Sequence, residues 1–320
     1  MQSAPATIVA SGLAVGLAAL VLLRHRRQTP RPVDAALLRD VEAFVFDCDG
    51  VIYKHKSVIE GVPKALAALR RAGKRIFFVT NAAGVSRVSL ANKLTKLGVD
   101  GVKSEHCITS ASAAAAFLTT NHPSVKRAYV VGGGGLFDEL RLSGIEPVGE
   151  TDVGGLEELL ASGGLEASLP IDAVVVGMLT DTLCYHRLAK AAAYARDRSR
   201  AFVGTNPDAS YPAGATELLP AGGCNVRYVS YGAEREPDAI VGKPSRDLAM
   251  LVGKLHGLKA ASTLMVGDRT NTDIAFGKSV GWRTLLVLTG CHGLAEVASA
   301  APGETPDYVT SSVADLAAFI

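Results

Sequence analysis

The sequence predicts an α/β protein built on a parallel sheet, and three observations support this. From Val41 onward, short apolar runs alternate with amphipathic segments of helical period, as strands and helices do in a parallel sheet. Hydrophobic residues make up 48% of the chain and charged residues 20%, which allows a large buried core and argues against a disordered chain. At 320 residues, the chain is long enough for two domains.

The N-terminal segment differs in composition from the rest. Residues 6–23 carry no charge and are largely apolar, and Arg24-His25-Arg26-Arg27 follows them. Such a stretch is at the short end of what can span a bilayer, and its basic flank would keep the bulk of the chain in the cytosol. We therefore expect residues 1–32 to be a membrane anchor with a basic linker. The alternative is a mitochondrial or plastid targeting segment.

Charge and cysteine content narrow the class of protein further. The net charge is +2, and without residues 1–32, which hold arginines and no acids, the chain is slightly acidic. We therefore expect no nucleic-acid partner. The five cysteines are scattered and form no Cys-x-x-Cys pair, which argues against a disulfide framework or a zinc site.

The alternating pattern gives a set of expected elements. The expected strands are Ala43–Phe46, Arg75–Val79, Ala128–Val131, Ala173–Val176, Ala201–Val203, Asp238–Val241, Thr263–Val266 and Thr284–Leu288. The expected helices are Pro63–Ala72, Val88–Leu97, Ser110–Thr119, Leu136–Leu142, Tyr185–Arg196, Arg246–His256 and Asp273–Val280. Pro63 suits the first turn of its helix, and Gly73 suits the position after its end.

Polar residues follow four of the expected strands directly. They are Asp47 with Asp49, Thr80 with Asn81, Lys243, and Asp268 with Asp273. Any one of them alone is explained by a helix cap or a solvated charge. Together they predict a site, because the carboxyl ends of parallel strands meet at one edge of the sheet, where open α/β sheets bind their ligands.

These residue types suit phosphoryl transfer through an aspartyl intermediate. The carboxylate of Asp47 could attack phosphorus and form an acyl-phosphate. Attack on a phosphate dianion needs a hard cation to relieve the repulsion, and Mg²⁺ with Asp47 and Asp268 as carboxylate ligands would serve. Asp49 could protonate the leaving alkoxide and later activate water. Thr80 and Lys243 could stabilise the charge on the phosphoryl oxygens.

With these motifs the sequence resembles the haloacid-dehalogenase superfamily of phosphatases. The matching segments are Asp47-Cys-Asp-Gly-Val51, Val79-Thr-Asn81, Gly242-Lys-Pro-Ser245 and Gly267-Asp-Arg-x-x-Thr-Asp273. The resemblance implies a Rossmann-like parallel sheet core, with Asp47 as the nucleophile and Asp49 as the acid and base. It also implies that Thr80, Asn81 and Lys243 contact substrate or phosphate. Mg²⁺ would be held by Asp47, Asp268 and the backbone carbonyl of Asp49, with Asp273 supporting the site.

The spacing of the motifs predicts an inserted α/β cap domain. The chain between Thr80 and Lys243 is far longer than a sheet crossover needs. We therefore expect a core at 33–108 and 237–320 and a C2-type cap at 109–236. This arrangement resembles the subgroup of eukaryotic phosphoglycolate, pyridoxal phosphate and p-nitrophenyl phosphatases. Local signatures of that subgroup recur at Gly204-Thr-Asn-Pro-Asp208, Cys224-Asn-Val-Arg227 and Arg235–Ser245.

The resemblance leads to a hypothesis about function. We expect a Mg²⁺-dependent hydrolase of small phosphorylated metabolites, with 2-phosphoglycolate as the first candidate substrate. Pyridoxal phosphate or a broad range tested with p-nitrophenyl phosphate is the alternative, and a non-catalytic, membrane-tethered binding protein on the same fold is the rival of another class. Tyr211 is the expected selectivity residue, and a homodimer through the cap is the expected assembly.

Overall fold

Seven parallel strands form the larger sheet of the computed structural model, which describes residues 29–163, 170–212 and 217–320. The strand order is β1-β16-β15-β14-β2-β5-β6. The strands are β1 (Arg31–Pro32), β2 (Ala43–Phe46), β5 (Arg75–Thr80), β6 (Cys107–Thr109), β14 (Thr263–Gly267), β15 (Arg283–Val287) and β16 (Tyr308–Thr310). The central strands are buried, as the apolar runs predicted.

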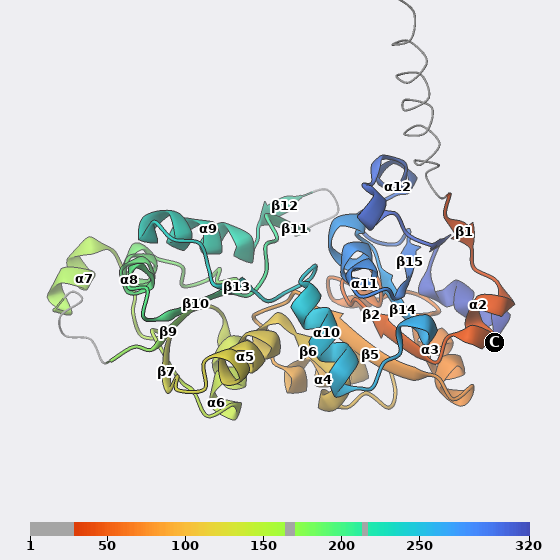
Figure 1. Cartoon of the computed structure of the whole chain (residues 1–320), viewed down its shortest axis with the longest axis horizontal. Helices are drawn as coiled ribbons and strands as arrows, with labels where there is room; N and C mark the ends of the chain where they lie inside the picture. The colour runs from red at the N-terminus through yellow and green to blue at the C-terminus, as the bar shows by residue number, and fades with distance from the viewer. Residues whose placement is uncertain (1–28, 164–169, 213–216) are drawn as a thin grey trace, which may run out of the picture.

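Five parallel strands form a second, smaller sheet beside the first (Figure 1). The strand order is β13-β10-β9-β7-β8. The strands are β7 (Arg127–Val131), β8 (Glu146–Val148), β9 (Ala173–Val176), β10 (Ala201–Gly204) and β13 (Ala239–Ile240). Two parallel sheets with helices confirm the predicted α/β class. The smaller sheet extends to Ile240, four residues beyond the expected boundary at 236, because β13 pairs with β10.

Helices cover both faces of each sheet. The main helices are α2 (Ala35–Asp40), α3 (Val62–Arg71), α4 (Arg87–Lys96), α5 (Ser110–Asn121), α6 (Gly134–Leu142), α8 (Tyr185–Arg196), α9 (Gly222–Ala233), α10 (Arg246–Leu255) and α11 (Ala275–Ser279). In β2, Phe44 and Phe46 pack towards α3 and α4, while Ala43 and Val45 pack towards α5 and α10. This alternation follows from the opposite side-chain directions of successive strand residues.

Helix α5 belongs to the cores of both sheets. Four of its alanines and Leu118 pack in one apolar cluster with Val45 and Phe77 of the larger sheet and with Val130 and Val175 of the smaller one. At its start, Thr109 and Ser112 form reciprocal side-chain bonds to the helix backbone. The small side chains of α5 let both sheets approach the same helix.

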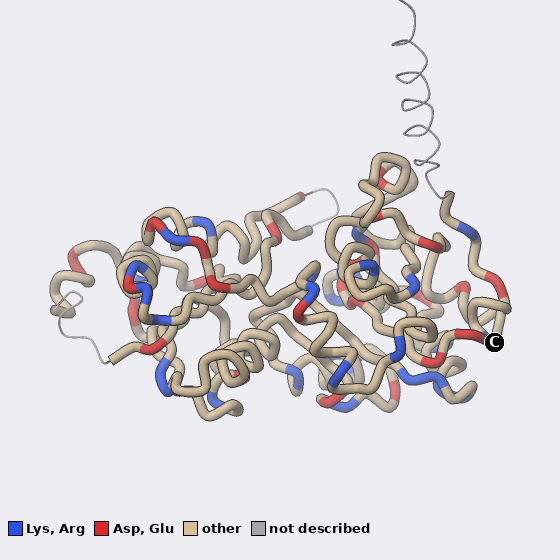
Figure 2. Tube along the Cα trace, viewed as in Figure 1, with Lys and Arg blue, Asp and Glu red and all other residues tan. Residues whose placement is uncertain are grey.

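Shorter elements surround the two sheets. They are β3 (Tyr53–Lys54), β4 (Ser57–Val58), α7 (Leu156–Ala161), β11 (Ser210–Pro212), β12 (Leu218–Pro220) and α12 (Leu294–Ser299). The 3₁₀ helices are η1 (Ser104–His106), η2 (Ala260–Ser262), η4 (Pro302–Glu304) and η5 (Val313–Phe319), and η3 (Thr270–Ile274) is a π-helical segment. Basic and acidic residues are interspersed over the trace (Figure 2).

The linker expected at the end of residues 1–32 includes a short strand. Arg31 and Pro32 form β1, which pairs with β16 at the edge of the larger sheet. The guanidinium of Arg31 donates a hydrogen bond of 2.6 Å to the Tyr308 hydroxyl and lies 4.5 Å from the centre of that ring. The larger sheet therefore includes two residues that precede the expected core boundary at 33.

The hydrophobic segment at residues 6–23 lies outside the described residues. Within the described ranges, no helix is long and apolar enough to cross a bilayer. The expected membrane anchor therefore stays a prediction.

The start of α6 touches the larger domain very closely. The Gly135 amide donates a hydrogen bond of 3.1 Å to the Gly84 carbonyl. A Cβ atom at Gly135 would lie 2.4 Å from the Val85 carbonyl carbon, whereas one at Gly134 would have no neighbour within 4 Å. One turn later, the buried carboxylate of Glu139 accepts hydrogen bonds from the backbone and guanidinium of Arg87.

This contact predicts that two adjacent glycines tolerate alanine very differently. The new Cβ atom of Gly135→Ala would clash with the backbone at Val85, and we expect the substitution to destabilise the protein by about 1–3 kcal/mol. Gly134→Ala is the matched control, and we expect an unchanged or slightly higher Tm because alanine favours the helix. Thermal unfolding of both variants beside the wild type checks the prediction. Equal Tm values for the two variants would contradict it.

Candidate active site

The carboxyl ends of three neighbouring strands define the candidate active site. Phe46, the last residue of β2, pairs with Phe78 of β5 on one side and Val266 of β14 on the other. Asp47 therefore begins where the central strand stops, and Asp268 follows the end of β14. This is the edge at which the sequence placed them, and the three strands lie together in the right half of Figure 1.

Three buried carboxylates meet at this edge. Asp47, Asp268 and Asp273 are 7%, 3% and 1% exposed, and each offers an oxygen within 4.8 Å of the others. The ammonium of Lys243 lies among them, donating a hydrogen bond of 2.7 Å to Oδ1 of Asp273 and another to Oδ1 of Asp47. Lys243 lies on the connection between β13 of the smaller sheet and α10, which packs against the larger sheet.

Burial and mutual repulsion set the protonation of the cluster. Burial, with the charge of Asp273, raises the pKa of Asp268 to about 6. Burial also raises the pKa of Asp47 well above its ordinary value, although the Lys243 ammonium opposes this. For Lys243, burial disfavours the charge, but Asp273 and Asp47 outweigh it and raise the pKa. The lysine therefore stays protonated.

The donor set fits a hard divalent cation. When all three carboxylates are ionised, they and the one ammonium carry a net charge of about −2, and Mg²⁺ prefers oxygen ligands. Oδ1 of Asp273 accepts from Lys243, and Oδ2 accepts from the backbone amides of Asp268 and Arg269. Within the described part of the chain, one oxygen each of Asp47 and Asp268 has no hydrogen-bond donor. These two oxygens are available to hold the ion.

The turn after β2 places Asp49 at the mouth of the site. Gly50 has φ 77°, and a Cβ atom there would lie 2.5 Å from Oδ2 of Asp268. Asp49 is exposed, and its carboxylate accepts a hydrogen bond of 3.1 Å from the Tyr53 hydroxyl. The surrounding protein raises the pKa of Asp49 by desolvation, against the opposing effects of Lys93 and this hydrogen bond. A raised pKa suits a group that must deliver a proton.

Thr80 and Asn81 lie at the end of β5, but their side chains are used differently. Thr80 is buried, and its hydroxyl oxygen accepts a hydrogen bond of 3.2 Å from the Ala82 amide. The Asn81 side chain was expected at the phosphate. Instead, its Oδ1 accepts from the Lys243 amide, and its Nδ2 donates to the Lys243 carbonyl and to Asp208. Both hydrogens of the amide group are therefore already used.

Two further residues near the motifs are Tyr211, the expected selectivity residue, and Cys48. Tyr211 lies in β11, opposite Leu219 of β12, and is half-buried. No hydrogen bond in the described structure joins it to the acidic cluster, so its role in selectivity stays a prediction. Cys48, between the two aspartates, is fully buried among core residues.

Sequence reasoning missed Asp208. Its carboxylate comes from the loop after β10 of the smaller domain and accepts a hydrogen bond of 3.0 Å from Asn81. Desolvation raises the pKa of Asp208, against the opposing effects of Asn81 and the nearby Lys243 and Arg269. The signature Gly204–Asp208 had indicated the segment, but nothing in it showed that the carboxylate reaches the larger domain.

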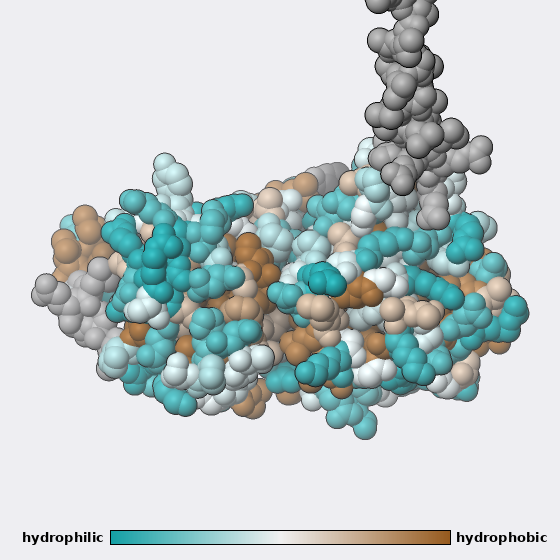
Figure 3. Space-filling view, in the orientation of Figure 1, coloured by the Kyte–Doolittle hydropathy of each residue, from teal (hydrophilic) through white to brown (hydrophobic). Residues whose placement is uncertain are grey.

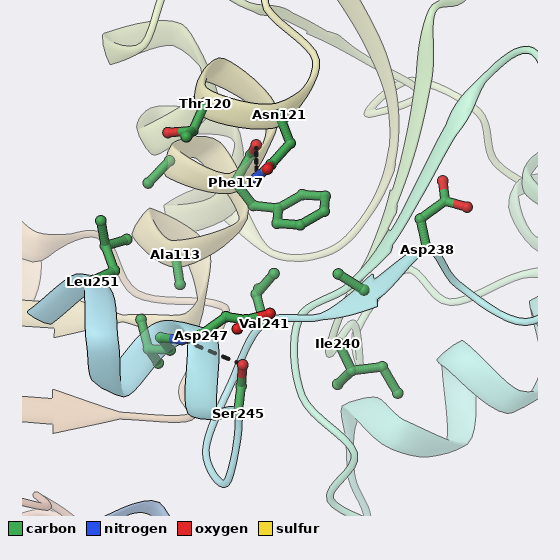
Figure 4. Close-up of a pocket in the computed structure, with 13 residues that line it drawn as sticks. Ala113, Phe117, Thr120, Asn121, Asp238, Ile240, Val241, Ser245, Asp247 and Leu251 are labelled. Atoms are coloured by element: carbon green, nitrogen blue, oxygen red, sulfur yellow. Dashed lines mark hydrogen bonds between the residues drawn. The ribbon is translucent and has the colours of Figure 1, made fainter. Parts of the chain in front are cut away.

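A separate pocket of about 300 Å³ lies between α5, β13 and α10 (Figure 4). Phe117, Ile240 and Leu248 are among the residues that line it. Val241 and Ser245 also line it, so it lies behind the segment that carries Lys243. None of the predicted site residues lines this pocket.

Comparisons with known proteins agree with the geometry. A family model described as haloacid dehalogenase-like hydrolase matches residues 44–146, and one described as HAD-hydrolase-like matches residues 240–316. Phosphoglycolate phosphatase 2 of Arabidopsis thaliana is 36% identical over 284 residues, covering 88% of this chain and 94% of that protein. Glycerol-3-phosphate phosphatase of Gallus gallus is 38% identical over 304 residues, covering 92% and 96%.

A solved structure extends the comparison to three dimensions. The glycerol phosphate phosphatase of Mycobacterium tuberculosis, determined in complex with magnesium, is 28% identical and has a TM-score of 0.73. The match covers 88% of this chain and 77% of that one. The chain therefore belongs to the haloacid dehalogenase-like hydrolases. Within this family it is a phosphatase, a phosphoric monoester hydrolase with a second α/β domain inserted into its core, as the motifs had predicted.

The acidic cluster predicts how the thermal stability of Asp268→Asn differs from that of the wild type, first in EDTA and then in Mg²⁺. Because the folded-state pKa of Asp268 is raised to about 6, its ionised form destabilises the metal-free protein above that pH. We expect Asp268→Asn to raise the Tm in EDTA at pH 7.5 by roughly 2–4 °C. The gain should shrink towards pH 5, where the wild-type carboxylate is protonated. Added Mg²⁺ should then stabilise the wild type and leave the variant largely unchanged.

Thermal shift assays in EDTA and in Mg²⁺ check this prediction. Asp138→Asn is the control, because Asp138 is exposed and forms only a long ion pair of 3.9 Å with the exposed Arg141 in the described structure. Equal stabilisation of wild type and Asp268→Asn by Mg²⁺ would remove Asp268 from the metal site.

Proposed function

We propose that this phosphatase hydrolyses a small phosphorylated metabolite through a phospho-aspartate on Asp47, with Mg²⁺ as its cofactor. The carrying observation is the cluster at the strand ends, in which Lys243 holds the Asp47 carboxylate beside Asp268. Asp47 and Asp268 would hold the ion, with the Asp49 carbonyl as a third ligand. When bound, the ion would offset the repulsion between the Asp47 carboxylate and the phosphate dianion.

The first half-reaction joins Asp47 to the phosphoryl group. The Asp47 carboxylate attacks phosphorus, and the bond between phosphorus and the alkoxide oxygen breaks. Asp49 delivers its proton to that alkoxide, while the Tyr53 hydroxyl keeps the carboxyl group oriented. The Lys243 ammonium, together with the Thr80 hydroxyl, stabilises the charge on the phosphoryl oxygens.

The second half-reaction releases phosphate. Asp49, now ionised, takes a proton from a water molecule as that water attacks the phosphorus of phospho-Asp47. The bond between phosphorus and the Asp47 oxygen breaks, and inorganic phosphate leaves. Asp273 accepts the Lys243 hydrogen bond throughout, so the ammonium stays in place when the Asp47 carboxylate is phosphorylated. The enzyme returns to its starting protonation state.

The substrate proposed first is 2-phosphoglycolate. It is supported by the likeness to the Arabidopsis phosphoglycolate phosphatase over nearly the whole chain. Glycerol 3-phosphate is the second candidate, because the Gallus gallus relative is of similar identity. Both are small monoesters that differ beyond the phosphate, one bearing a carboxylate and the other two hydroxyls. Pyridoxal phosphate and p-nitrophenyl phosphate complete the set of candidates.

A panel of these four esters tests the proposed function. With Mg²⁺ we expect phosphate release from all small esters that enter the site, and the highest kcat/KM for 2-phosphoglycolate. EDTA should abolish release, and restored Mg²⁺ should recover it. A higher kcat/KM for glycerol 3-phosphate would overturn the substrate assignment, and no turnover of any ester would overturn the enzyme function and favour a binding protein.

Replacing the nucleophile gives a sharper test of mechanism. Asp47→Asn keeps the size of the side chain and an oxygen for Lys243, but an amide does not attack phosphorus. We expect kcat to fall by about 10³-fold or more, with an unchanged circular dichroism spectrum. Asp138→Asn, on the exposed face of α6, should keep wild-type kcat. Retained turnover in Asp47→Asn would assign the nucleophile elsewhere.

Two further proposals concern the localisation of the enzyme and its oligomeric state. For residues 6–23 we propose a membrane anchor that leaves the catalytic domain in the cytoplasm, with an organellar targeting segment as the alternative. For the cap we propose a homodimer contact. It is supported by exposed Tyr228 and Tyr231 on α9, and by exposed Leu218 and Leu219 on β12, where Figure 3 shows hydrophobic surface.

A further inference from the structure

A loop of the smaller domain packs closely against the segment that contains Lys243. The loop runs from Thr205 to Asp208, directly after β10. A Cβ atom at Gly242 would lie 2.5 Å from the Thr205 carbonyl oxygen and 2.8 Å from Oδ1 of Asn81. Only a residue without a side chain fits between the two. The proposed mechanism gives this loop no role, although it reaches the neighbour of Lys243.

Asn81 connects this loop to Lys243. Its Nδ2 donates a hydrogen bond of 3.0 Å to Oδ2 of Asp208, and another of 3.0 Å to the Lys243 carbonyl. Its Oδ1 accepts a bond of 2.7 Å from the Lys243 amide. The backbone carbonyl of Asn81 accepts from Asn206 at 2.9 Å and from Ser110 at 2.8 Å. Asn81 is therefore held by both domains.

The partners fix the orientation of the Asn81 amide. A backbone N–H only donates, so the Lys243 amide must face Oδ1 of Asn81. An ionised carboxylate only accepts, so Asp208 must face Nδ2. The two requirements agree, and together they leave one orientation. In that orientation the Asn81 side-chain amide forms hydrogen bonds with both the backbone N–H and the backbone carbonyl of Lys243.

We propose that Asp208 is a positioning residue that sets the place of Lys243 through Asn81. The carboxylate fixes the amide, the amide fixes the lysine backbone, and the backbone aims the ammonium at Asp47 and Asp273. The smaller domain thereby helps to set the geometry of the chemistry while Asp208 stays out of contact with the reacting atoms. This inference rests on the proposed function, because it assigns a catalytic consequence to the position of Lys243.

Two other roles for Asp208 are distinguishable from this one. If its charge acted on Lys243 through space, neutralising the carboxylate would matter and the hydrogen bond would not. If it contacted substrate directly, its loss would change KM and would add to the loss of Asn81. The positioning role requires the hydrogen bond and requires Asn81.

The test is a mutant cycle with Asp208→Ala, Asp208→Asn, Asn81→Ala and the double variant, assayed on p-nitrophenyl phosphate with Mg²⁺. We expect Asp208→Ala to lower kcat about 10- to 100-fold, with KM changed less than about threefold. Asp208→Asn still offers an oxygen to Nδ2 and should recover most of kcat. The double variant should be no slower than Asn81→Ala. Asp138→Ala on α6 serves as the control for loss of an exposed carboxylate.

Hydrogen exchange of the Lys243 amide gives a readout that needs no enzymatic activity. We expect faster exchange in a peptide spanning residues 241–246 for Asp208→Ala and Asn81→Ala, and near wild-type exchange for Asp208→Asn. Unchanged exchange in Asp208→Ala, additive losses of kcat, or equal losses in Asp208→Ala and Asp208→Asn would each overturn the inference. A wild type without turnover would instead overturn the proposed function, while the exchange result still decides the contact.

Discussion

The ammonium of Lys243 is the group on which the rest of this structure depends. Three carboxylates buried at one sheet edge repel each other, and this one cation lies between two of them. Removing one partner of a buried ion pair typically costs about 3–5 kcal/mol, so the cluster is stable only while the lysine is present. Lys243 lies on the connection between β13, which pairs in the smaller sheet, and α10, which packs against the larger one. The position of its backbone therefore depends on how the two sheets are packed together.

The apolar core provides that packing. Helix α5 packs in one cluster with residues of both sheets, so the smaller domain shares buried surface with the larger one and is not attached by linkers alone. Close backbone contact at Gly135 and the buried Glu139 carboxylate fix the same interface at another point. Hydrophobic burial supplies the non-directional attraction, and the polar contacts select the orientation that brings Lys243 to Asp47.

The sequence predicted those elements that depend on residues close together in the chain. β2 and β9 have the predicted bounds, because uniformly apolar runs bounded by polar residues mark buried strands. The acids of the site were predicted because parallel strands end at the same edge. Helix α9 was missed because it opens on Gly222-Gly223 without a side-chain cap, so no start signal is visible. The partners of Asn81 were missed because Asp208 is distant along the chain and meets it only through domain packing.

The carboxylates of the site differ in burial and in hydrogen-bond partners, and these surroundings determine how readily each one ionises. Asp47 and Asp268 lie buried beside another acid, and burial raises the pKa of both. A dication bound between them would reverse that balance, since its charge favours the ionised forms and metal binding would release the protons. Asp49 lies two residues from Asp47 but at the exposed mouth, bonded to a hydroxyl and not to the lysine. The cation would thus favour the ionised form of Asp47, the proposed nucleophile, and leave the carboxyl group of Asp49 free to carry a proton.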